Sequence, residues 1–141
     1  PATRLGAGAA RFAAAIGRST GPARCIDFTG KTSSLRDVIT LLAIGRVLVT
    51  NDSGPAHVAS LTDIHCLVLF GPETPQLYGP LGTHATPLYA GLACSPCVRA
   101  ANHRRTTCRD NKCLQAIAVD EVLAAVVARL GTAPVAAGTG G

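Results

Sequence analysis

The feature that most constrains the fold of this chain is a pair of short apolar runs at residues 46–50 and 65–70. Val47, Leu48 and Val49 follow one another without alternating with polar residues, and the letters CLVLF continue in the same way in the second run. Uninterrupted runs of this length are typical of strands that are covered on both faces, as in a parallel sheet. We therefore expect two fully buried strands.

Helical patterns lie around these runs. Ser34 stands three residues before Asp37, the spacing of a capping box at the start of a helix, and Gly45 is expected to end that helix. Residues 72–92 are rich in Pro and Gly and are expected to form an excursion without regular structure. The remaining expected elements are helices at residues 4–17, 55–61 and 119–130 and a short strand at residues 25–28.

Strands that alternate with helices along a chain indicate an α/β fold, here a parallel sheet covered by helices on both faces. Ligands of such sheets bind beyond the carboxyl ends of the strands. A length of 141 residues suits one domain, expected over residues 1–131, with residues 132–141 as a disordered tail. Three expected strand ends carry glycine-containing loops that should meet at one crevice: Thr29-Gly30, Asn51–Gly54 and Gly71-Pro72.

Composition and charge narrow the class of protein. The chain contains no run of about 18 or more uncharged apolar residues, so we expect no membrane span and a cytoplasmic location. The net charge of +5 would suit a nucleic-acid partner, but the charges are mostly scattered and lack interleaved aromatic residues. One basic cluster fits a solvated loop, an anionic small molecule, an anionic lipid surface or a zinc-bearing module that binds nucleic acid: Arg99, His103, Arg104, Arg105, Arg109 and Lys112.

The loop Asn51-Asp52-Ser53-Gly54, between a strand and a short helix, is the strongest candidate for a binding site. The first turn of a helix leaves main-chain N–H groups without partners and carries a partial positive charge. Gly54 lets a ligand approach the backbone and Ser53 adds a hydroxyl, so a phosphate or diphosphate is the expected occupant. His57 could donate to the same phosphate or to the negative charge that develops on a leaving group, and Asp52 would accept hydrogen bonds from sugar hydroxyls or from the backbone. The alternative is that Asp52 and Ser53 only cap the helix.

A second candidate is Gly30-Lys31-Thr32. The letters GKTS are similar to the end of a P-loop, but that motif requires a glycine five residues before Gly30, and Cys25 stands there. We therefore reject a P-loop. We expect instead that the backbone at this neighbouring strand end forms a cradle for a nucleoside.

Residues 94–113, the cysteine-rich segment, hold four cysteines at the spacing C-x2-C-x10-C-x4-C: Cys94, Cys97, Cys108 and Cys113. Four thiolates in two pairs are the ligands that tetrahedral structural zinc prefers. Disulfides are not expected in the cytoplasm. Two alternatives stay open, a structural zinc held by all four cysteines and reduced thiols without a metal.

Taken together, these motifs resemble a known family. VLVTNDSGPAHVASL, preceded by FTGKTSSLRDVITLL and followed by LFGPETP, closely resembles the donor-binding half of glycosyltransferase family nine, the lipopolysaccharide heptosyltransferases and their relatives. The similarity extends through GPLG and the pattern CSPC…C…CLQAI…DEV, over about residues 5–130. The family often carries this cysteine pattern, which argues for a structural role. One local departure, LTDIH in place of the commoner small-residue and Pro turn, leaves the site motif intact.

The resemblance implies a GT-B fold of two Rossmann-like domains, with this chain as an incomplete carboxy-terminal one. It implies an inverting, metal-independent transfer from a nucleotide sugar, ADP-heptose in the best-known members, to a lipopolysaccharide core at the inner face of the inner membrane, without nucleic acid. The catalytic base would lie in the missing amino-terminal acceptor domain, so no catalytic residue is expected here and the fragment alone should be inactive. The alternative is a non-catalytic nucleotide- or phosphate-binding α/β module. Carried over by position, the diphosphate and sugar contacts would be Asp52, Ser53, Gly54 and His57, and Gly30, Lys31 and Thr32 would lie near the nucleoside.

Overall fold

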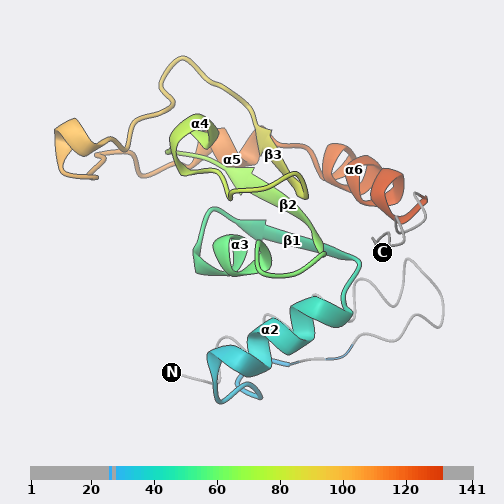
Figure 1. Ribbon diagram of the computed structural model, residues 1–141. Helices are drawn as coiled ribbons and strands as arrows, with labels where there is room; N and C mark the ends of the chain where they lie inside the picture. Colours follow the sequence, from blue (N-terminus) through green and yellow to red (C-terminus); the bar gives the residue numbers. More distant parts are fainter. Residues whose placement is uncertain (1–25, 27, 132–141) are drawn as a thin grey trace. The chain divides into compact units, whose positions relative to one another are not determined.

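The computed structural model describes residue 26 and residues 28–131 (Figure 1). The helix expected at residues 4–17 and the tail at 132–141 lie outside these residues, as do two positions of the strand expected at 25–28. Ile26 and Phe28 are described, and neither belongs to a strand. The elements in chain order are α2 (Leu35–Ile44), β1 (Val47–Asn51), α3 (Gly54–Ala59), β2 (His65–Phe70), α4 (Pro75–Tyr78), β3 (Ala85–Tyr89), the 3-10 helix η1 (Ala100–Asn102), α5 (Lys112–Gln115) and α6 (Val119–Gly131).

The chain divides into two compact units, Pro1–Val38 and Ile39–Gly141. In the described part of the first unit, the expected capping box opens α2. The main-chain N–H of Ser34 donates to Asp37 Oδ2 over 3.0 Å, and the N–H of Asp37 donates to Ser34 Oγ over 3.2 Å. Ser33 adds two further hydrogen bonds to the same carboxylate, and together these bonds lower the pKa of Asp37. The prediction of a capped helix that ends before Gly45 is confirmed.

The second unit contains a parallel sheet in the order β1-β2-β3. Val47 pairs with His65 at the start of β1, and Leu67 of β2 pairs with Thr86 of β3. Each strand is joined to the next by a connection that contains a helix, α3 and then α4 (Figure 1). The carboxyl ends of the three strands therefore lie at one edge of the sheet, where ligands of such folds bind.

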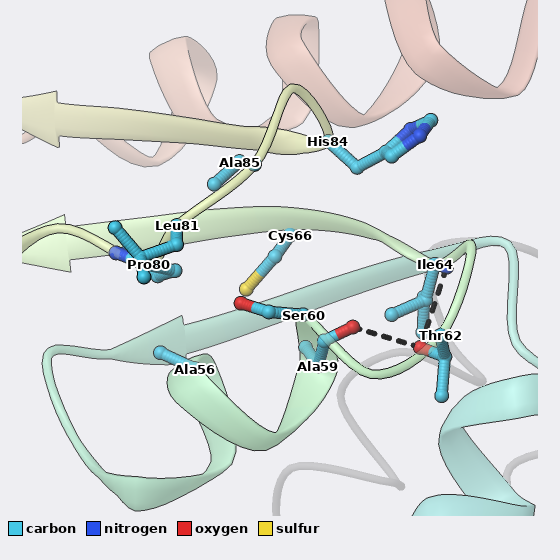
Figure 2. A pocket seen from close by; sticks show the side chains of 11 residues that line it. Ala56, Ala59, Ser60, Thr62, Ile64, Cys66, Pro80, Leu81, His84 and Ala85 are labelled. Atoms are coloured by element: carbon cyan, nitrogen blue, oxygen red, sulfur yellow. Dashed lines mark hydrogen bonds between the residues drawn. The ribbon is translucent and has the colours of Figure 1, made fainter.

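Helices cover both faces of this sheet, as predicted. Leu67 and Val68 are adjacent in β2, so their side chains point to opposite faces, yet both are fully buried. On one face, Cys66 of β2 lines a hollow together with residues of α3. On the other face, Arg129 of α6 donates a hydrogen bond to Thr86 Oγ1 over 3.2 Å. Figure 2 shows Ala56 and Ala59 of α3 and Cys66 of β2 around the hollow. The prediction of a parallel α/β fold is confirmed.

Two details of the sequence-based prediction are wrong. The run at residues 46–50 was expected to be fully buried, but Val49 is 42% exposed because β1 has a described neighbour on one side only. The excursion at residues 72–92 was expected to lack regular structure, but it contains α4 and β3, the third strand of the described sheet. Pro87 makes β3 difficult to predict from the sequence, because proline is tolerated in a strand only where no neighbouring strand needs its N–H, as at a sheet edge.

No helix in the part of the chain that the structure describes is both long and apolar enough to cross a membrane. The cysteine-rich segment contributes only η1 and the start of α5, and residues 99–112 are exposed. Cys66 is buried within β2, as expected of a core cysteine, and this burial raises the pKa of its thiol.

Candidate functional site

A cleft of about 360 Å3 opens at the carboxyl ends of β1 and β2, where the sequence predicted a crevice. Its walls come from the loop after β1, the loop after β2 and the cysteine-rich segment. All of them belong to the second unit. The residues that line it are Asn51, Asp52, Ser53, Gly54, His57, Leu69, Gly71, Pro72, Glu73, Tyr78, Arg104 and Leu114.

The loop that follows β1 presents main-chain donors to this cleft. The N–H of Asp52 still belongs to the sheet, because it donates to the Leu69 carbonyl over 3.2 Å. Ser53 is extended (φ −163°), and neither its N–H nor that of Gly54 donates a hydrogen bond to any residue that the structure describes. A Cβ built on Gly54 would meet no atom within 4 Å, so the backbone at this point is open to a ligand.

The local chemistry of this loop differs from the sequence-based expectation in one respect. Ser53 is the residue before α3, but its side chain does not cap the helix. Its hydroxyl donates instead to the Asn51 carbonyl over 3.1 Å. Within α3, Pro55 has no N–H and the N–H of Ala56 already donates to the Ser53 carbonyl over 3.0 Å. The open donors are therefore the two N–H groups of Ser53 and Gly54, fewer than the four that the start of a helix usually leaves without partners.

The other predicted residues of this loop also face the cleft. Asp52 is half-buried and His57 is exposed, and both belong to the cleft wall. Their predicted contacts with sugar hydroxyls and with phosphate stay predictions. Gly30, Lys31 and Thr32 belong to the other unit, where Gly30 adopts a φ of +70° and the N–H of Lys31 donates to the Phe28 carbonyl over 3.0 Å. Their predicted role near a nucleoside also stays a prediction.

Sequence reasoning missed a charged cluster on the opposite wall of the cleft. Glu73 is only 8% exposed, and its Oε1 accepts a charge-assisted hydrogen bond from Arg104 Nη2. The Arg104 guanidinium carbon also lies 4.8 Å from the centroid of the Tyr78 ring, a cation–π contact. The second carboxylate oxygen, Oε2, is buried and has no partner among the described residues. The sequence placed Arg104 in a basic cluster that fits an anionic small molecule, but no signal in it paired that residue with Glu73, three residues after the end of β2.

The floor of the cleft is closely packed against the end of the cysteine-rich segment. A Cβ added to Gly71 would lie 2.8 Å from Leu114 Cγ and 3.3 Å from Cys113 Sγ. Only glycine therefore fits between β2 and α5 at this point. The segment thus lines the cleft through Arg104, and Leu114, the residue that directly follows it, lines the cleft as well.

The four cysteines of the predicted zinc site are not gathered. Cys94 and Cys108 are exposed, Cys97 is half-buried and Cys113 is buried beneath Gly71. Among the described residues, no three side chains of His, Cys, Asp or Glu are close enough together to hold a metal ion. The residues as placed therefore do not form a tetrahedral zinc site, and zinc binding would require the segment to rearrange.

A second hollow lies between α3 and the loop that leads into β3, and its lining includes Ala56, Cys66, Leu81 and His84 (Figure 2). Its volume is about 40 Å3. A water needs about 10–15 Å3 of such space, so this hollow has room for only a few solvent molecules. It is too small for a nucleotide or a sugar, which leaves the cleft as the candidate site.

The fold and the cleft together define an α/β domain with a ligand site at the carboxyl ends of parallel strands. The chain belongs to glycosyltransferase family 9 (heptosyltransferase), whose family model matches residues 5–107. It is 39% identical over 62 residues to lipooligosaccharide heptosyltransferase 2 of Haemophilus influenzae, which is 44% of this chain and 18% of that protein. It is 33% identical over 79 residues to lipopolysaccharide heptosyltransferase 1 of Pseudomonas aeruginosa, which is 56% of this chain and 22% of that protein.

A similar match, 38% identity over 61 residues, links the chain to lipopolysaccharide heptosyltransferase 2 of Salmonella typhimurium, with 43% of this chain and 17% of that protein aligned. The aligned stretches thus span about a fifth of the length of these curated relatives. No solved structure matches the chain. The resemblance read from the NDSGPAH and LFGPETP motifs is confirmed at the level of the family.

Proposed function

We propose that this chain is the donor-binding part of an inverting, metal-independent glycosyltransferase that transfers a sugar from a nucleotide sugar to a lipopolysaccharide-type acceptor. The proposed donor is ADP-heptose. The observation that carries the proposal is the open cleft at the carboxyl ends of β1 and β2, lined by the NDSG loop, in a chain of the heptosyltransferase family. The names of the related proteins support heptose as the sugar and lipopolysaccharide as the acceptor.

In this proposal, the diphosphate of the donor lies against the loop after β1. The N–H groups of Ser53 and Gly54 have no other acceptor among the described residues, so they can donate to phosphate oxygens. His57 lies on the same wall and donates to the leaving diphosphate, while the Asp52 carboxylate accepts hydrogen bonds from sugar hydroxyls.

The chemical step requires a base that deprotonates the acceptor hydroxyl, and we assign none of the described residues to that role. The base belongs to an acceptor-binding domain in the same enzyme. The chain by itself therefore binds the donor without turning it over. The proposed setting is the cytoplasmic side of the inner membrane, where a peripheral enzyme meets its lipid-linked acceptor.

Titration calorimetry of the chain with ADP, GDP and UDP tests the proposed donor site. We expect at least one of these nucleotides to bind and Gly54→Val to abolish binding, because the new side chain fills the open approach to the backbone. Gly131→Val is the matched control, since a Cβ at Gly131 also meets no atom within 4 Å and lies outside the cleft. Both variants should unfold at the temperature of the parent chain. Binding that Gly54→Val leaves intact would contradict the assigned site.

A further inference from the structure

We propose that Arg104, from the cysteine-rich segment, is the diphosphate-binding cation of the cleft, and that Glu73 is the positioning residue that aims it. This inference rests on the proposed function, because it names a further residue for the same ligand. Neither residue lies in the motif after β1 that marks the site in the sequence. Both line the cleft.

The charges of the cleft wall give the first reason. Asp52 and Glu73 bring two carboxylates to the site, and Arg104 is the only lysine or arginine among the residues that line it. A nucleoside diphosphate adds several more negative charges beside these carboxylates. Negative charges held close together in a partly desolvated cleft repel each other strongly. A positive group that faces the ligand is therefore required, and Arg104 is the residue in place to supply it.

The contacts of the Arg104 guanidinium give the second reason. One nitrogen, Nη2, donates to Glu73, and the guanidinium carbon lies over the ring of Tyr78. The side chain is still 55% exposed, so the remaining N–H groups of the guanidinium are open to the cleft. A planar guanidinium with one side occupied by a carboxylate can donate from its other edge to a phosphate oxygen. Arg104 can thus bridge Glu73 and a diphosphate.

Hydrogen bonds of the backbone around Arg104 fix the position of this residue at the cleft. The N–H of Arg104 donates to the Arg99 carbonyl over 2.9 Å, and Asn102 Nδ2 donates to the Cys97 carbonyl over 2.7 Å. His103 and Arg104 both adopt positive φ angles, 53° and 57°, which non-glycine residues seldom do. The turn thus holds the Arg104 side chain over the cleft, while its neighbour Arg105 does not line the cleft.

Calorimetry with a nucleoside diphosphate that binds the parent chain, and with the matching nucleoside, tests the inference. Arg104→Ala should weaken diphosphate binding about ten- to hundredfold, the loss of one or two charge-assisted hydrogen bonds, and leave nucleoside binding unchanged. Arg105→Ala is the matched control, since it removes the same charge from the same turn and should change affinity by less than about twofold. Equal weakening for diphosphate and nucleoside would overturn the inference.

A second comparison separates ligand contact from a structural role. Arg104→Ala leaves the buried Glu73 carboxylate unpaired, which can disturb the fold or repel the ligand by itself. Glu73→Gln removes that charge. If Arg104 contacts the diphosphate, the double variant Glu73→Gln/Arg104→Ala should bind about ten- to hundredfold more weakly than Glu73→Gln alone. Equal affinities of these two variants would show that Arg104 only neutralises Glu73 and would overturn the inference.

These results also separate the inference from the proposed function. Nucleotide binding that Gly54→Val abolishes and Arg104→Ala leaves unchanged would overturn only the role of Arg104. Failure of the parent chain to bind any of the three nucleotides would overturn the proposed donor site and the role of Arg104 together.

Discussion

A methyl group added at Gly71 should destabilise the chain, although the same change at Gly54 should not. Gly71 is buried at the end of β2, and its new Cβ would lie 2.8 Å from Leu114 Cγ and 3.1 Å from Leu114 Cδ2. Such short contacts force side-chain and backbone shifts, and overpacking of this kind typically costs about 1–3 kcal/mol of the free energy of unfolding. For a domain of this size, that cost corresponds to a decrease in Tm of about 5–15 °C.

The measurement is thermal unfolding followed by circular dichroism for Gly71→Ala and Gly54→Ala. Gly54→Ala is the matched control, because both glycines line the cleft but only Gly71 lacks space for a side chain. Leu114→Ala combined with Gly71→Ala should recover part of the loss, with a coupling free energy of at least about 0.5 kcal/mol. A Gly71→Ala chain as stable as the parent, or additive costs in the double variant, would refute the packing argument.

Three further predictions follow from the described residues. Burial, together with the positive charges of Arg129 and His84, lowers the pKa of His65 in the folded chain. Neutral His65 therefore contributes its full share to the free energy of unfolding above about pH 6.5, the pKa in the unfolded chain, and this contribution is lost as the pH falls through the lower pKa of the folded chain. The Tm should thus decrease between about pH 7.5 and about pH 5, and His65→Gln should reduce that decrease; an unchanged decrease would exclude His65 as its source. Ser34→Ala should cost about 1 kcal/mol of the free energy of unfolding by removing the capping bond to Asp37, whereas Ser34→Thr should not, and equal Tm values for the two variants would contradict this. Metal analysis of the chain purified without chelator should find far less than one zinc per chain, and a full equivalent would show that the cysteine-rich segment rearranges around a metal.

The second strand and the last helix could be predicted from the sequence, because their patterns are long and regular. The run at residues 65–70 became β2 with the expected bounds, and the helix expected at 119–130 became α6. β3 could not be found in this way. Its letters, ATPLY, have Thr86 and Pro87 in place of a continuous apolar run, and the strand forms because β2 supplies a neighbour through tertiary pairing.

The site was predictable only where it is local. Asn51 to Gly54 follow a strand directly, so their place at its carboxyl end could be inferred from the order of elements. The contact between Glu73 and Arg104 spans 31 residues of sequence. It depends on the path by which the cysteine-rich segment returns to the sheet, and no periodicity encodes that path. The same path decides which thiols approach each other, which is why cysteine spacing alone did not reveal their separation.

The part of the cleft wall that lies in and just after the cysteine-rich segment has a consequence for redesign. Arg104 of this segment and Leu114, the residue that follows it, line the cleft without belonging to a strand of the sheet, whereas Leu67, Val68 and Phe70 of β2 are fully buried in the interior. Exchanging only the exposed residues 99–112 for those of a relative would therefore alter the shape and charge of the binding surface, while the packing of Gly71 against Cys113 and Leu114 stays intact. Changes to these exposed residues could therefore alter ligand preference without altering the thermal stability of the chain.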